Sequence, residues 1–251
     1  MFSKRSGIPV IAAAAAVIVL TLAGCGAAKN TSGSGASGGA GKADVAYAGS
    51  LMVANEQYVG PAFAKATGDA YQGRGGGAFG VANLIKAGEI QPNVFESIGT
   101  APITGLEPKF TTWAVGFMAQ PLVVAYSPHS PFAAQLDAIR KGTKPLADLF
   151  TMMENPQFHL GRTNPETDPQ GQAFIFMLNL AAQKYKLPAQ TVDKIIGSPN
   201  NPKQIFAETA ILSRLEAGQL DASSAYLPEA VQHHLPYITL PDDINMGNPA
   251  F

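Results

Sequence analysis

The sequence predicts an α/β fold built on a mostly parallel sheet, because short apolar segments alternate with helical patterns. Segments 45–48, 70–72 and 93–95 are largely apolar and stop at a glycine or a polar residue, which is typical of buried strands. A helix is predicted from about Ala78 to Lys86, with Gly88 as its C-terminal stop. Strands that alternate with helices in this way are typical of parallel sheets covered on both faces.

The N-terminus predicts an exported lipoprotein. It begins with Lys4 and Arg5, continues with an apolar run from Ile8 to Leu22, and reaches Cys25 directly afterwards. The apolar run would form a helix of ~22 Å, shorter than the ~30 Å hydrocarbon core of a bilayer, so a signal peptide over residues 1–25 is favoured over a spanning helix. The four residues that end at Cys25 resemble the lipobox of bacterial lipoproteins. This resemblance implies acylation of Cys25 and anchoring to the cell membrane on its extracytoplasmic face.

Cys25 is the only cysteine, so no disulfide can form within the chain, and an ordinary signal peptide with an incidental cysteine is the alternative. Residues 26–42 are mostly Gly, Ser and Ala, which predicts a flexible tether with a reach of ~23 Å.

The remaining residues, 43–251, are enough for one large or two small domains. With 17 basic against 18 acidic residues and no basic patch, nucleic acid is not an expected partner. We expect a monomer.

Further elements are predicted along the folded part. They are a helical pattern over 51–67 interrupted near Gly60-Pro61, a strand passing between domains within 113–126, strands at 158–162, 220–226 and 237–240, and helices at 169–185 and 206–217.

Candidate ligand contacts lie where predicted strands meet helix starts. Gly49-Ser50, the loop 73–77 and Asp168-Pro169 are three such places. Ligands of open α/β sheets collect at the carboxyl ends of strands, and helix N-termini there favour an anion. Ser50, Ser97 and Thr100 would add hydroxyl donors. The alternative is that these residues only cap helices and form tight turns.

Other chemistries have weaker support. Gly75, Gly77 and Gly80 fit the dinucleotide pattern G-x-G-x-x-G, with Glu96 at the end of the next strand, but the pattern alone has low specificity. The hydrolase motifs G-x-S-x-G and H-E-x-x-H are absent, and the adjacent His233-His234 would point in different directions. We therefore expect a binding protein without enzymatic activity, cofactor or metal.

Several motifs resemble the solute-binding lipoproteins of molybdate/tungstate ABC importers. They are Ala48-Gly49-Ser50-Leu51, the glycine-rich loop, residues 161–171, Glu208 with Leu212 and Leu215, 217–221, Tyr226, and 232–245. The resemblance covers nearly all of residues 44–251. It implies the type II periplasmic-binding-protein fold, an α/β fold with two lobes around a ligand cleft. The expected first lobe is 43–117, the second is 118–236, and 237–251 is a return segment.

The resemblance also implies an oxyanion site. Ser50, Gly77, Ala78 and Ser97 would face the anion from the first lobe. The amides around Gln170, the Asp168 carboxylate and the Tyr226 hydroxyl would face it from the second lobe.

Two departures from the family affect the expected ligand. Ala78 stands where the family usually has Ser, and Ala225 stands where some tungstate binders have Glu. The sequence therefore predicts recognition of a tetrahedral anion without a carboxylate-completed metal. Molybdate or tungstate is the expected ligand and sulfate or a small organic anion is the alternative.

The resemblance implies membrane partners as well. The protein would deliver its anion to ABC permease subunits and would contact the membrane through its lipid anchor. Family members usually continue well past Asn245, so a chain that stops at Phe251 is expected to be a shortened copy. A degenerate lipoprotein without transport activity is the remaining alternative.

Overall fold

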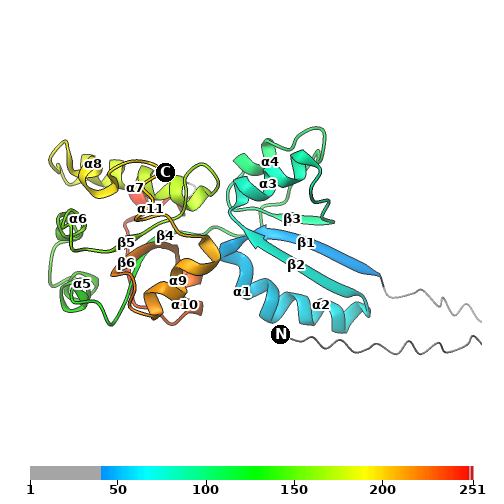
Figure 1. Ribbon diagram of the computed structural model, residues 1–251, viewed down its shortest axis with the longest axis horizontal. Coiled ribbons are helices and arrows are strands. Elements are labelled where there is room, and N and C mark those ends of the chain that lie inside the picture. Colours follow the sequence, from blue (N-terminus) through cyan, green and yellow to red (C-terminus); the bar gives the residue numbers. More distant parts are fainter. Residues whose placement is uncertain (1–40, 249, 251) are drawn as a thin grey trace, which may run out of the picture. The chain divides into compact units, whose positions relative to one another are not determined.

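The computed structural model describes residues 41–248 and 250, so the predicted signal peptide, Cys25 and nearly all of the predicted tether lie outside the described residues. Two sheets organise the described part (Figure 1). The first has three parallel strands in the order β2-β1-β3. Its strands are β1 (Lys42–Ala48), β2 (Ala70–Gly76) and β3 (Val94–Glu96). The predicted parallel sheet is therefore present, although β1 begins already at Lys42.

The glycine-rich segment is mostly strand rather than loop, which corrects the sequence-based interpretation. Its glycines admit the ring of Tyr47 from the neighbouring strand β1. A Cβ on Gly73 would lie 2.9 Å from Tyr47 Cε1, and one on Gly75 would lie 2.7 Å from Cε2. Since such approaches are too short for real Cβ atoms, packing against Tyr47 explains these two glycines without a bound phosphate.

Helices cover both faces of the first sheet (Figure 1). On one face lies a helical stretch made of the 3₁₀ turn Gly49–Leu51, α1 (Met52–Ala54), the π-helical turn Asn55–Val59 and α2 (Gly60–Thr67). The predicted interruption at Gly60-Pro61 is wrong, because the backbone stays helical from the π turn through Val59 and Gly60 into α2. The other face carries α3 (Ala78–Ala87) and α4 (Ala101–Thr104). Gly88, at φ 74°, ends α3 as predicted.

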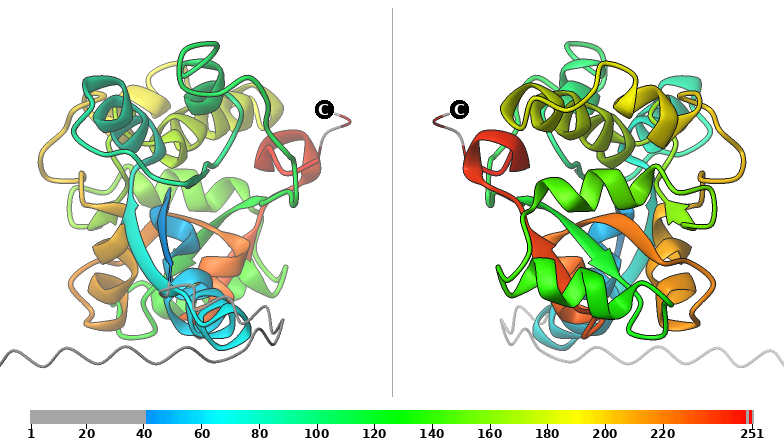
Figure 2. Two further views of the ribbon diagram at one scale, coloured as in Figure 1. Left: turned by 90° about the vertical axis from the view of Figure 1, so that its right-hand side faces the viewer. Right: turned by 90° about the vertical axis from the view of Figure 1, so that its left-hand side faces the viewer.

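The second sheet is mixed, which the sequence did not predict. Its order is β5-β6-β4-β7, formed by β5 (Leu160–Gly161), β6 (Ala222–Tyr226), β4 (Leu122–Tyr126) and β7 (Tyr237–Thr239). β5 runs parallel to β6, whereas β4 is antiparallel to both of its neighbours. Figure 2 shows β4 beside the C-terminal strands β6 and β7, although about a hundred residues separate them in sequence.

Both faces of this sheet are buried under helices. Leu122, Val124 and Tyr126 pack against one group of helices, and Val123 and Ala125 pack against another. The first group includes α5 (Ala133–Arg140), α6 (Ala147–Met153), α7 (Pro169–Lys184), α8 (Thr191–Ile196) and α11 (Asp242–Asn245); the second includes α9 (Glu208–Glu216) and α10 (Leu227–Gln232). The predicted helices 169–185 and 206–217 are confirmed as α7 and α9.

The apolar run predicted as one strand over 113–126 is strand only from Leu122 onward. Residues 112–121 form no helix or strand. Trp113 and Val115 are 73% and 70% exposed, so this run is not a buried core segment. Within the described residues no strand pairs with it. Apolar character alone therefore did not determine a strand here, because a strand also requires a partner for its backbone groups.

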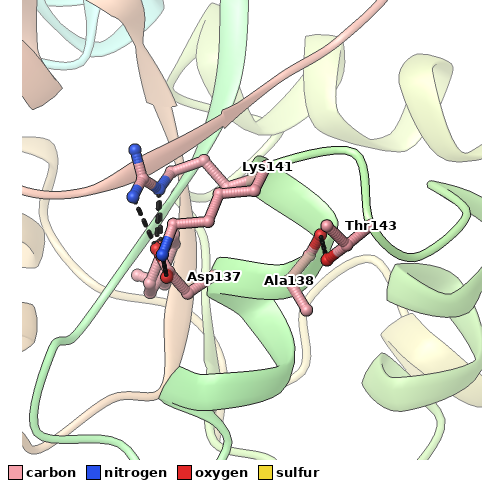
Figure 3. A network of polar contacts seen from close by, with 6 residues as sticks. Asp137, Ala138, Lys141 and Thr143 are labelled. Carbon is pink, nitrogen blue, oxygen red and sulfur yellow. Dashed lines mark hydrogen bonds and ion pairs between the residues drawn. The ribbon is translucent and has the colours of Figure 1, made fainter.

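Polar contacts fix the end of α5 beside the second sheet (Figure 3). Asp137 accepts hydrogen bonds from Arg140 Nη2 at 2.6 Å and from Tyr126 Oη of β4 at 3.1 Å, and it pairs with Lys141 Nζ at 2.5 Å. These partners lower the pKa of Asp137 to about 2. Thr143 donates to the carbonyl of Ala138 and closes the last turn.

In residues 41–248, no helix has both the length and the apolar character needed to cross a bilayer.

Candidate functional site

Several helix starts meet at one place between the two sheets. A Cβ on Gly49, at the start of the first helical stretch, would lie 2.6 Å from Glu208 Oε2, the first residue of α9. A Cβ on Gly77, directly before α3, would lie 2.5 Å from the carbonyl oxygen of Thr167 and 3.1 Å from Asp168 Cβ, directly before α7. The Gly80 amide also donates to Thr167 O at 3.0 Å. The positive ends of four helix dipoles therefore converge.

A cavity of only about 10 Å³, room for about one water molecule, lies beside the starts of the first helical stretch and of α9. It is lined by Gly49, Ser50, Met52, Val53, Glu208, Thr209, Leu212, Glu229, Gln232 and His233. The Ser50 hydroxyl is buried here, with the residue only 4% exposed, and has no hydrogen-bond partner among the described residues. A buried hydroxyl without a partner costs free energy, which makes Ser50 a candidate ligand contact.

Asp168 is the N-cap of α7. Its Oδ1 accepts the Gln170 amide at 2.8 Å, and Pro169 fills the first helical position. The carboxyl is buried, and the Thr163 hydroxyl lies beside it without meeting hydrogen-bond geometry. Burial raises the pKa of Asp168 to about 6. The predicted capping role of Asp168 is confirmed, and its position next to the cavity residues adds a second role as a candidate ligand contact.

Gln170 and Glu229 form a hydrogen-bonded layer beneath the site. Gln170 Nε2 donates to Glu229 Oε2 at 2.8 Å, and Ser224 Oγ donates to Gln170 Oε1 at 3.1 Å. Glu229 Oε2 also accepts the Tyr226 amide at 2.7 Å. Burial raises the pKa of Glu229 to about 8. Since the Gln170 amide and side chain are both engaged within the protein, Gln170 positions its neighbours.

Glu208 is the most unusual group at the site. It is 6% exposed, and within residues 41–248 neither carboxyl oxygen makes a hydrogen bond of acceptable geometry. The backbone amides of Gly49 and Ser50 lie beside it. Burial raises the pKa of Glu208 well above its usual value, and the charges of Asp168 and Glu229 raise it further. Burial beside the same three acids raises the pKa of the Tyr226 hydroxyl as well.

The structure brings most of the predicted site residues together and leaves one apart. Ser50, Asp168, Gln170 and Tyr226 are buried in one connected region, and the contact of Gly77 with Asp168 brings the start of α3, including the fully buried Ala78, to the same region. Ser97 differs, because its hydroxyl donates to the carbonyls of Ile98 and Gly99 in its own loop. It lines a much larger hollow of about 1300 Å³, which Pro169 and Tyr226 line as well.

Sequence reasoning missed Glu208, Glu229 and Thr163 as site residues. Ala225 had argued against a carboxylate-completed metal, and the structure places Glu208 and Glu229 as further buried acids near Asp168. Glu208 was named only as part of a family motif, with Leu212 and Leu215. Acidic residues at helix starts are common on the surface as dipole partners, and the burial of Glu208 could not be predicted from spacing. No group of His, Cys, Asp and Glu side chains in the described part of the chain has the arrangement of a metal site.

Comparisons with known proteins identify the family of this chain. The family described as bacterial extracellular solute-binding protein matches residues 43–251. A putative ABC transporter molybdenum-binding protein of Haloferax volcanii is 34% identical over 142 residues, which cover 57% of this chain and 43% of that protein. The molybdate/tungstate-binding protein WtpA of Thermococcus kodakarensis is 27% identical over 159 residues, which cover 56% of this chain and 43% of that protein. The matches thus cover less than half the length of these relatives.

The fold is also found among solved structures. The periplasmic molybdate-binding protein of Azotobacter vinelandii superposes with a TM-score of 0.57 at 20% identity, covering 82% of this chain and 80% of that protein. This similarity confirms the predicted type II periplasmic-binding-protein fold. Because the family match spans all of residues 43–251, the chain belongs to the bacterial extracellular solute-binding proteins.

Proposed function

We propose that this chain captures a tetrahedral oxyanion, molybdate or tungstate, and delivers it to the permease of an ABC importer. Membership in an extracellular family supports a position of the folded part outside the cytoplasm. The proposed ligand follows the names of the Haloferax and Thermococcus relatives. In the proposal the lobes are residues 43–117 and 118–236, and the anion is bound where their helix starts meet.

One observation carries this proposal. The Ser50 hydroxyl is buried without a partner in the described part of the chain, at the junction of helix starts and beside the amide of Gly49. Helix N-termini and neutral hydroxyl donors suit an anion, because they stabilise negative charge without a fixed counter-charge. A cavity of about 10 Å³ is too small for a tetrahedral oxyanion, so binding requires the lobes to separate and close again.

Attachment to the membrane is part of the same proposal. We place the lipid on Cys25, which precedes the described residues, and assign residues 26–42 as the tether. An acylated cysteine would keep the binding lobes near the permease, and the protein would act as a monomer. A single acyl chain binds membranes weakly, so stable anchoring requires more than one chain on this residue.

The test is ligand-induced stabilisation of the full chain. Thermal unfolding would be followed with sodium molybdate, tungstate, sulfate or phosphate, and with chloride at matched ionic strength as the control. An anion present at 100 times its dissociation constant adds about 2.7 kcal/mol to native stability, which is a readily measured rise in melting temperature. A cooperative transition that none of these anions shifts would refute the proposed function. A shift with sulfate alone would replace the proposed ligand.

A further inference from the structure

Exposed apolar side chains gather around the large hollow that Ser97 lines. Eight of the twelve large apolar side chains that are exposed in the described residues line this one hollow of about 1300 Å³. Four of them lie on the segment before β4 and are between 57% and 73% exposed: Trp113, Val115, Phe117 and Met118. These four side chains are named the apolar rim. A contiguous apolar surface of this kind marks a contact site for a protein or a membrane.

The segment that carries the apolar rim suits the interfacial layer of a bilayer. Its sequence has no charged residue from Phe110 to Gln120. Within the described residues, no backbone group from Ala114 to Gln120 makes a hydrogen bond to another backbone group. Unpaired backbone groups must stay hydrated, so the segment cannot enter the hydrocarbon core, but its side chains can reach the boundary between headgroups and acyl chains. Tryptophan is enriched at this depth.

The end of the proposed tether lies at the edge of the same hollow. Asn93, which lines the hollow, accepts the Asp44 amide through its Oδ1 at 2.8 Å, and the Asn93 amide donates to the Asp44 carbonyl at 2.8 Å. Asp44 is the third residue of β1 and follows the end of the tether at Lys42 by two positions. A lipid on Cys25 would therefore hold this edge of the hollow near the bilayer, with an r.m.s. reach of ~23 Å.

We propose that the apolar rim contacts the lipid bilayer, with the side chains of Trp113, Val115 and Phe117 in the interfacial layer. This inference rests on the proposed lipid anchor. The tether raises the effective concentration of the bilayer at the rim, so a shallow contact is enough to fix the orientation of the domain against the membrane. Without the lipid the rim is too weakly bound to keep the protein there, because only its side chains leave water.

The experiment uses the fluorescence of Trp113, which is the only tryptophan in the sequence and so reports on the rim alone. The protein is purified from the membranes of the producing cells and reconstituted into phosphatidylcholine vesicles, with or without bromine on the acyl chains. Bromine quenches only a tryptophan that touches the lipid. We expect the brominated lipid to remove most of the Trp113 emission, and aqueous iodide to quench it little. The loss should persist at high salt, because the contact is apolar.

Matched variants assign the contact to the rim. The double variant Val115→Ser with Phe117→Ser should lose the quenching by brominated lipid and regain quenching by iodide. Val231→Ser is the control, because Val231 is 52% exposed and lies away from the hollow, and it should behave as wild type. Since all three side chains are exposed, the variants should melt at the wild-type temperature.

The outcomes separate the rim from the anchor and from anion capture. A protein that floats with the vesicles while Trp113 stays open to iodide overturns the inference and leaves the anchor intact. A protein that does not float overturns the anchor and the inference with it. Protection of Trp113 from iodide that requires high protein concentration and no lipid would assign the rim to a second copy of the chain, and so would also overturn it. Anion-induced stabilisation of the same preparation reports separately on the proposed function.

Discussion

The carboxyl group of Glu208 lies against Gly49 so closely that a Cβ on this glycine would come within 2.6 Å of Oε2 and 3.0 Å of the Glu208 Cβ. The contact joins the start of α9 to the start of the first helical stretch. Gly49 is not among the glycines with positive φ, so its backbone conformation is open to any residue. Close approach, and not backbone conformation, is therefore the reason for a glycine here.

Gly49→Ala tests this contact. The added methyl group must displace the Glu208 side chain, and we expect a destabilisation of about 1–3 kcal/mol together with about tenfold or greater loss of anion affinity. Chemical unfolding and calorimetry would measure the two effects. Gly116→Ala is the matched control, because no described atom lies within 4 Å of the position that its methyl group would occupy and its φ is not positive. Equal stability and equal anion affinity of the two variants would contradict the close contact between Gly49 and Glu208.

Ser50 and Ser97 offer a direct comparison of two predicted contacts. Ser50→Ala should weaken anion binding by about 1.5–3 kcal/mol, because its buried hydroxyl can donate to a charged ligand. Stability without ligand should change little, since no hydrogen bond within the described residues is lost. Ser97→Ala should leave affinity unaltered, because that hydroxyl donates within its own loop. Calorimetry measures the anion affinity of both variants. An equal loss of affinity in both would show that the anion is not bound at Ser50 as proposed.

The buried acids also predict how stability depends on pH. Glu229 has a folded pKa of about 8 against its usual 4.5, so the native state binds more protons between these values. The free energy of unfolding should therefore be highest below the usual pKa and should fall as the pH rises toward 8, with a slope of at most about 1.4 kcal/mol per pH unit for one proton. The pKa values of Asp168 and Glu208 are raised as well, so these two groups also make the free energy of unfolding fall as the pH rises.

Thermal melts of wild type and Glu229→Gln between about pH 5 and 8 measure this dependence. The glutamine oxygen can still accept the Tyr226 amide, so the variant should fold, and its melting temperature should fall less steeply with pH. A wild-type melting temperature that rises over this range would contradict the pKa assigned to Glu229.

Cys25→Ser tests the proposed anchor in cells. Because acylation requires the thiol, the variant should leave the membrane fraction and appear in the soluble extracytoplasmic fraction, while wild type remains with the membrane. Immunoblots of the two fractions provide the measurement. A variant that still sediments with membranes would show that the protein is held by something other than a lipid on Cys25.

The elements predicted well were those with strong local signals. Helix α7 carries an Asp-Pro start and an apolar face, and α3 ends at a glycine in the left-handed conformation. The strands of the first sheet stop at glycines or polar residues, and they pair in parallel as expected. These features depend on neighbouring residues in sequence, so they are readable without the tertiary structure.

Features that depend on distant residues were predicted poorly. The apolar run before β4 lacks a pairing strand within the described residues, and the antiparallel pairing of β4 with β6 and β7 depends on segments about a hundred residues away. The short helices α5, α6, α8 and α10 were also missed, because helices of this length are stabilised mainly by the core they cover.

The sequence by itself determined the α/β class and the placement of Ser50 and Asp168 at helix starts, and it alone predicts the export signal, because each follows from residue types at fixed local spacing. Only the tertiary structure brings Glu208 and Glu229 into the buried region around them and pairs the Ser97 hydroxyl with carbonyls of its own loop. Burial and charge proximity are properties of the packed chain. A glutamate at a helix start is a surface dipole partner when it is solvated, whereas burial beside other acids raises its pKa.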